Sequence, residues 1–231
     1  MTLSEIATFA GEKIGKTDSD TVTFLKKSAS LNYRRVWNFA PWRETVTHST
    51  YSVSTSTRTI TLGSNVETPL AVAYGDDELA AIDLPTIIAQ DADLLDTDRT
   101  GTPMAYYFKG RDTGGTSQID LYPILNTTGT TTLKVVEKLK CLTRNNHVVD
   151  FPPSTDALDD ELRLPHCHQV VLDLVHADAL QRERQYEKAA SVVNTANADL
   201  SAMASYELSQ VGSVKQITPS GLGELLREEI E

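Results

Sequence analysis

Cysteine, long apolar runs and export signals are scarce or missing in this chain of 231 residues. Its two cysteines, Cys141 and Cys167, are too few for a disulfide framework and fit a reducing compartment. No run of about 18 apolar residues occurs, so the sequence predicts no membrane-spanning helix and no membrane partner. Residues 1–5 lack the basic and then apolar pattern of a signal peptide, so we expect no secretion by that route.

The sequence also lacks the short motifs of common catalytic sites. It contains no Gly-x-Ser-x-Gly, no glycine-rich phosphate loop followed by Lys-Ser or Lys-Thr, and no His-Glu-x-x-His. His166, Cys167 and His168 form a metal-like cluster, but side chains at i and i+2 of a helix point apart and no second pair lies at ligand spacing. Cys–His nucleophile pairs normally come from separate elements. We therefore expect no enzyme, no metal and no cofactor, and we assign no catalytic residue.

Acidic residues give the chain a net charge of −11 and are concentrated in two segments. Residues 76–100 carry eight acids against one arginine (−7), and residues 150–163 carry five against one (−4). Residues 1–43 carry seven bases and four acids (+3). Two interpretations stay open: the patches pair between copies or line a surface that must not adhere to DNA, or they are solvated loops.

Three consecutive carboxylates, Asp159, Asp160 and Glu161, end the second acidic segment. Such a group can serve as a general acid or base. At the entrance to a helix, however, carboxylates more often stabilise the helix dipole. We predict this second role, because the helical period begins again a few residues later.

Helical periodicity appears first near the N-terminus. One apolar stripe ends at Gly15, and a second runs from a cap at Asp18 or Ser19 to Pro41. The first stripe is Leu3, Ile6, Ala7, Ala10 and Ile14, and the second is Val22, Leu25, Ala29, Tyr33, Val36 and Ala40. These stripes predict a pair of helices with one apolar face each.

The middle of the chain has the composition and alternation of β strands. Residues 45–62 suggest a hairpin of half-buried strands, and Leu70, Val72 and Tyr74 alternate again. Residues 84–95 suggest a short helix with Pro85 in its first turn. Two further strands, 104–108 and 117–122, flank a Gly-Gly hairpin turn, and a last strand covers 130–138 with Leu133 and Val135 on one face. We expect five to seven strands, enough for a small sandwich or barrel.

The helical period returns after Leu164-Pro165-His166 and continues to about residue 210. Cys167, Val171, Leu174 and Asp178 lie along one stripe, with Val170, Ala177 and Leu180 beside it, and a second stripe contains Tyr186, Ala189, Val193, Ala196, Leu200 and Met203. Residues 181–185 separate the stripes without glycine or proline, so they are either a tight turn between antiparallel helices or the middle of one helix. Residues 211–231 are predicted to form a tail with a short amphipathic piece at its end.

Arg34 and Arg35 stand among Tyr33, Trp37 and Trp42, a mixture that binds single-stranded nucleic acid in some proteins. Such sites usually lie on strongly positive surfaces, whereas this chain is acidic and the aromatic residues follow the apolar stripe. We therefore predict that the aromatic residues pack in the core and that the arginines face outward or toward another element.

In order and spacing, these segments resemble the head-to-tail adaptors of tailed bacteriophages, the connector ring proteins below the portal that include tail tubular protein A. The likeness extends from the first helix to about residue 208 and depends on four signposts: the aromatic segment 37–42, the Gly-Thr-Pro-x-x-Tyr-Tyr pattern at 101–107, Leu121-Tyr122-Pro123 and Leu164-Pro165-His166. It implies an α+β fold: a helical bundle of residues 1–43 and 151–210, an inserted antiparallel β sandwich or small barrel at 44–150, and a tail at 211–231. It also favours a turn between the last two helices.

The resemblance further implies a structural virion protein. About twelve copies would form a closed homo-oligomeric ring in the neck of the particle, between the portal protein and the tail or nozzle proteins. The ring would extend the channel through which DNA passes during ejection, without sequence-specific binding. We expect assembly in the host cytoplasm and a final place in the virion.

Two groups of candidate site residues follow from this resemblance and from the charge pattern. The tail is expected to bind the portal through an apolar face of Leu222, Leu225, Leu226 and Ile230. A contact between protomers or the channel wall is expected to contain Asp91, Asp93, Asp96, Arg34 and Arg35. Other functions stay open at this point: a tail terminator or another neck ring protein, or a β-domain enzyme or carbohydrate-binding protein.

Overall fold

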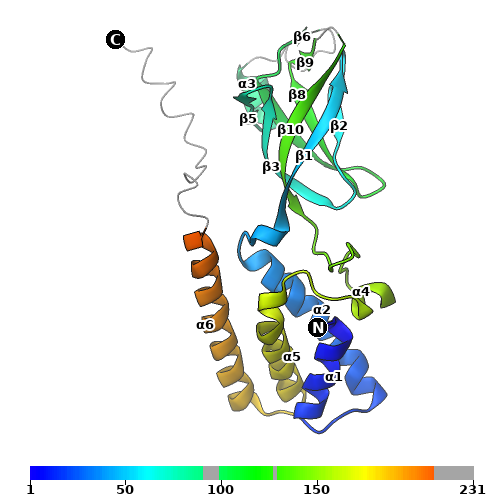
Figure 1. Cartoon of the computed structure of the whole chain (residues 1–231), viewed down its shortest axis with the longest axis vertical. Helices are drawn as coiled ribbons and strands as arrows, with labels where there is room; N and C mark the ends of the chain where they lie inside the picture. The colour runs from blue at the N-terminus through cyan, green and yellow to red at the C-terminus, as the bar shows by residue number, and fades with distance from the viewer. Residues whose placement is uncertain (91–98, 127–128, 211–231) are drawn as a thin grey trace.

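The computed structural model describes residues 1–90, 99–126 and 129–210, and it has a helical lobe and a β lobe arranged end to end (Figure 1). The helical lobe contains elements from both ends of the described chain, and the β lobe is built from the residues between them. The predicted α+β class is therefore confirmed.

The first helix, α1 (Leu3–Lys13), begins with a capping box. The Thr2 hydroxyl accepts a hydrogen bond from the Glu5 amide, and the Glu5 carboxylate accepts one from the Thr2 amide. After Ile14 the backbone turns at Gly15, whose φ of +69° suits a residue without a Cβ. The helix therefore begins and ends where local sequence chemistry places it.

The second helix, α2 (Ser19–Phe39), is capped by Asp18, whose carboxylate accepts from the Thr21 amide at 2.9 Å. It ends before Pro41, because a proline disfavours the helical conformation of the residue that precedes it, here Ala40. A short 3-10 turn, η1 (Arg43–Thr45), then leads into the β lobe.

The C-terminal part of the bundle is a helical hairpin. After α4 (Thr155–Asp159) and the 3-10 turn η3 (Pro165–Cys167), helix α5 (His168–Arg182) is followed by α6 (Tyr186–Gln210). Arg184 reverses the chain with a φ of +59°. Of the two alternatives for residues 181–185, the structure therefore has the turn, made without the glycine or asparagine that usually occupies such a position.

Helix α5 is the centre of the helical lobe. It packs against α1, α2 and α6, so apolar side chains surround it instead of forming one narrow stripe. Asp178, on the predicted apolar stripe, accepts hydrogen bonds from Ser28 and Asn32. The shared core includes Leu3, Ile6, Leu25, Ala29, Val36, Val170, Val171, Leu174, Val175, Ala196 and Leu200. Burying one such Leu or Val side chain contributes about 1.5–3 kcal/mol.

The β lobe is a sandwich of two four-stranded sheets. The first sheet has the order β1 (Val46–Ser54), β10 (Thr130–Leu139), β3 (Val66–Tyr74), β4 (Asp77–Glu78). The second has the order β2 (Thr59–Thr61), β8 (Ser117–Tyr122), β7 (Ala105–Arg111), β5 (Ala80–Ala81). A small pair joins β6 (Thr100–Gly101) to β9 (Ile124–Leu125). One apolar core lies between the sheets and includes Val53, Ile60, Val72, Tyr106, Ile119, Leu121, Leu133 and Val135.

Several strand predictions agree with this sandwich. Strands β7 and β8 form the predicted hairpin, with Asp112 accepting from the amides of Gly114 and Thr116 in its turn. On β10, Leu133 and Val135 share the buried face, as predicted. Helix α3 (Leu84–Gln90) has Pro85 in its first turn, and residues 91–95 of the predicted helix lie outside the described residues.

Three strand predictions were wrong. Residues 45–62 do not form a hairpin, because β1 pairs with β10 whereas β2 pairs with β8 in the other sheet. Leu70 does not share a face with Val72, because a bulge interrupts the pairing of β3 with β10 and leaves Leu70 exposed. The described residues form ten strands instead of five to seven, since four two-residue strands are too short to give a periodic signal.

Candidate interaction surfaces

Three aromatic residues, in the C-terminal half of α2 and just after it, belong to the core of the helical lobe. Tyr33, Trp37 and Trp42 are completely buried. The Trp37 indole donates to the Leu139 carbonyl oxygen at 3.2 Å, and the Trp42 indole donates to that of Val36 at 2.7 Å. Base stacking needs accessible ring faces, which these residues lack. The prediction of core packing is confirmed.

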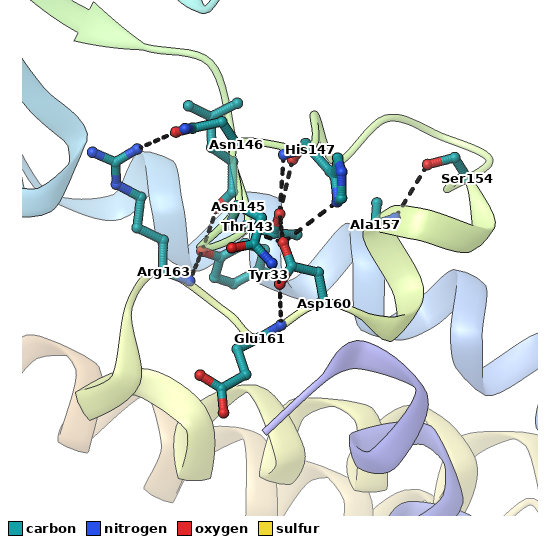
Figure 2. A network of polar contacts seen from close by, with 11 residues as sticks. Tyr33, Thr143, Asn145, Asn146, His147, Ser154, Ala157, Asp160, Glu161 and Arg163 are labelled. Atoms are coloured by element: carbon teal, nitrogen blue, oxygen red, sulfur yellow. Dashed lines mark hydrogen bonds and ion pairs between the residues drawn. The ribbon is translucent and has the colours of Figure 1, made fainter.

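Tyr33 also connects α2 to the segment between the sandwich and α5 (Figure 2). Its hydroxyl donates to the Leu142 carbonyl at 2.9 Å and accepts from the Arg163 amide at 3.1 Å. Burial raises the pKa of Tyr33 well above its ordinary value, so the group stays a neutral hydroxyl that can make both bonds.

Asp160 is a buried carboxylate at the centre of a polar network in the same segment (Figure 2). Its carboxylate accepts hydrogen bonds from the Thr143 hydroxyl, from the Asn145 amide and side chain at 2.9 and 2.7 Å, and from the Glu161 amide at 2.8 Å. His147 lies 3.4 Å from the same carboxylate. Burial by itself raises the pKa of Asp160, but these hydrogen bonds outweigh it and lower the pKa below its ordinary value.

The predicted helix-dipole role of the carboxylates at 159–161 is wrong. Asp159 ends α4 and Asp160 follows it, so these residues stand at the end of one helix and not at the start of the next. The Asp159 carboxylate accepts a hydrogen bond from the Ser4 hydroxyl. Asp160 accepts from the Asn145 amide in the 143–147 loop, and Glu161 forms an ion pair with Arg144. The network therefore links segments that are distant in the sequence: α1, the 143–147 loop and the end of α4.

A second buried carboxylate, Glu137, was not anticipated. It is 1% exposed and accepts hydrogen bonds from Ser49 at 2.7 Å and from the Tyr51 hydroxyl. Burial, together with the hydrogen bond to Glu137, raises the pKa of Tyr51 to about 12. The alternation that places Leu133 and Val135 on the inner face of β10 continues to Glu137. The two-residue period of the strand could therefore have predicted from the sequence that Glu137 faces inward.

The His166-Cys167-His168 cluster packs as part of the helix entrance. Cys167 is completely buried, and the His166 ring makes an edge contact with Trp42 at 5.5 Å between ring centroids. Burial raises the pKa of Cys167 to about 12 and also raises the pKa of Cys141. Within residues 1–90, 99–126 and 129–210, no three His, Cys, Asp or Glu side chains gather as metal ligands.

The two candidate arginines occupy different environments. Arg35 is exposed and donates to the Asn197 side chain at 3.1 Å, which connects α2 to α6. Arg34 is half-buried and lines a hollow of about 80 Å³ where the helical and β lobes meet. No hydrogen bond or ion pair joins Arg34 to another described residue. The remaining lining residues include Glu67, Arg111, Lys140, Cys141 and Asp150.

Only part of the acidic segment 76–100 is described. Asp76, Asp77, Glu78 and Asp83 are exposed, and the Lys134 ammonium lies 3.8 Å from the Asp76 carboxylate. Asp91, Asp93 and Asp96 lie outside the described residues. The same holds for Leu222, Leu225, Leu226 and Ile230. For all of these residues the expected contacts therefore stay predictions.

The outer face of the first sheet carries an apolar hollow with a volume of about 510 Å³. It extends across β1, β10 and β3, and its lining includes His48, Thr50, Ala71, Ala73 and Val136. No aromatic side chain other than His48 lines it, although ligand sites usually contain several.

In the comparison with known proteins, no family model matches the chain, and no curated protein matches it. Among the helices of the described residues, none is both long enough and apolar enough to cross a membrane.

Proposed function

We propose that this chain is a structural virion protein, a head-to-tail adaptor that forms a closed ring between the portal and the tail of a bacteriophage. About twelve copies surround and extend the DNA channel through head-to-tail contacts that use two different surfaces of each copy. The protein works by assembly and not by catalysis, in the neck of the particle.

One observation carries the proposal: the order of the elements together with their layout. Two N-terminal helices and two long C-terminal helices pack as one bundle, and the β sandwich is inserted between them. Tyr33, Trp37 and Trp42 are buried in that bundle. The side chains of Tyr33 and Trp37 donate hydrogen bonds there to the carbonyls of Leu142 and Leu139. This order of helix pair, aromatic closure, sandwich and helical hairpin matches the resemblance in the sequence.

Imaging of the intact particle tests the proposal. Purified virions that carry this protein are expected to show, by cryo-electron microscopy, a closed ring below the portal into which the two lobes fit. Particles made without the protein should stop as DNA-filled heads that lack tails. Absence of the chain from purified virions by mass spectrometry, or density for it anywhere except the neck, would overturn the proposal.

The acidic segment provides a second test. Changing Asp91, Asp93 and Asp96 together to Asn is expected to impair ring assembly or DNA passage, because the substitution removes three charges from a segment of net charge −7. A matched control removes three exposed carboxylates of the helical lobe, Asp20, Asp156 and Asp199. If the Asp91, Asp93 and Asp96 variant keeps the particle yield and infectivity of the unsubstituted protein, as the control does, the segment lies neither at the protomer contact nor on the channel wall.

The tail provides a third test. Leu222, Leu225, Leu226 and Ile230 would form an apolar helical face about two turns long, which is marginal alone and gains stability by docking. Deleting residues 213–231 should leave a folded protomer that does not attach to portal-containing heads. Attachment of the truncated protein at full occupancy would show that the tail is not the anchor.

A further inference from the structure

Strand β1 leaves one edge of the sandwich open. All nine of its residues, Val46–Ser54, pair with β10, and the sheet order places no described strand on its other side. Among the described elements, β10 is the one that β1 packs against extensively. The outer amides and carbonyls of β1 therefore form a row that another strand can bind.

The opposite edge of the same sheet is protected. Strand β4 covers only Ala73 and Tyr74 of β3, and the uncovered part of β3 contains Glu67, Pro69 and the bulge at Leu70. Charge, proline and bulges are the usual means of preventing strand addition. Strand β1 has none of them: its sequence, Val-Thr-His-Ser-Thr-Tyr-Ser-Val-Ser, lacks acids, Lys, Arg and proline, and its register with β10 is unbroken. Only one of these two long edges is therefore suited to accept a strand.

The sequence outside the described residues contains a candidate partner for this edge. Residues 213–218, Ser-Val-Lys-Gln-Ile-Thr, are rich in β-branched side chains and are bounded by Gly212 and Pro219. Six such residues between glycine and proline are typical of a strand, and they would extend for about 20 Å, less than the length of β1. The segment carries one lysine and no acid, so the uncharged β1 does not repel it.

The geometry favours a neighbouring copy over the same copy as acceptor. Figure 1 shows the end of α6 on the side of β3, whereas β1 lies beyond β10. Residues 211 and 212 can extend for only about 7 Å. Crossing from β3 to the free side of β1 requires about three strand spacings, or about 14 Å. The end of α6, where the tail begins, and the free edge of β1 thus lie on opposite flanks, as a head-to-tail contact requires.

We propose that residues 213–218 of one copy add as an extra strand along β1 of the next copy. This inference rests on the proposed ring and names the contact that closes it. Main-chain hydrogen bonds supply the affinity, and alternate side chains of the added strand lie over the outer face of the sheet.

Cysteine pairs in the full-length chain test the contact. One cysteine replaces Thr50 in the middle of β1, and a second replaces in turn each of Val214, Lys215, Gln216 and Ile217. The native Cys141 and Cys167 are buried with raised pKa values, so they do not compete under mild oxidation. We expect covalent dimers and higher oligomers on a non-reducing gel. The crosslinked bands should be strong for every second tail position and weak for the positions between, because successive side chains of a strand point to opposite faces.

The protected edge supplies the matched control. Thr68→Cys on β3, combined with the same tail cysteines, is expected to give no covalent oligomers. The proposal is overturned by equal oligomers from both edges, by no oligomers from either, or by crosslinks only within monomers. A neck ring in imaged particles without these crosslinks would refute this contact and leave the proposed function standing. Deleting residues 220–231 should preserve the crosslinks while removing attachment to heads.

Discussion

Replacing Asp160 with Asn should destabilise the protein more than any exposed acidic substitution. The Asp160 carboxylate accepts four hydrogen bonds and is 8% exposed. An Asn side chain keeps one acceptor oxygen and turns an NH₂ group toward donors. Hydrogen bonds to a charged group are worth about 1.5–3 kcal/mol each and do not add fully, so we expect a loss of about 3 kcal/mol. For a chain of this size that loss lowers Tm by about 6–12 °C.

Urea unfolding followed by circular dichroism measures this loss, and Asp156→Asn is the control. Asp156 belongs to the same acidic segment but is exposed in the first turn of α4, where a carboxylate contributes about 0.3–1 kcal/mol. If the two variants differ by less than about 0.5 kcal/mol, a spread typical of surface substitutions, the network does not stabilise the fold.

The same substitution should remove part of the acid sensitivity of the protein. The folded pKa of Asp160 is lowered, so its contribution is complete above the unfolded pKa of about 3.9 and is lost as pH falls through the folded pKa. The stability difference between the native protein and Asp160→Asn should therefore shrink below about pH 4. A difference that stays constant down to pH 2 would contradict this assignment.

Three further outcomes follow from the structure. Cys141 and Cys167 should resist maleimide at pH 7.5 and react after denaturation, as measured by intact mass, because burial raises the pKa of both thiols; labelling of the folded chain within minutes would show the sites to be open. Tyr33→Phe should cost about 1–3 kcal/mol in urea unfolding, since it leaves two backbone groups without a partner, and an unchanged midpoint would refute this. Arg184→Gly should raise stability by up to about 1 kcal/mol, because glycine adopts a positive φ without strain; a lower Tm would indicate an unrecognised role for the arginine.

The candidate surfaces were only partly predictable. Aromatic residues on a helical stripe are buried wherever the helix packs, so the fate of Tyr33 and Trp37 followed from periodicity. Arg34 and Arg35 are adjacent in sequence, but their separate environments depend on α6 and on the β lobe, which local patterns do not place. The burial of Asp160 depends on Thr143 and Asn145, whose approach is fixed by the return of the chain from the sandwich.

The sequence by itself determined features whose causes lie within a few residues. The cap at Asp18, the stop before Pro41 and the hairpin turn at Asp112 belong to this group, because side chain and backbone partner are close along the chain. The tertiary structure decided features with distant partners. Strand β1 pairs with β10, which begins more than seventy-five residues later in the chain. The turn at Arg184 forms because the packing of α6 on α5 contributes more free energy than the strained backbone costs.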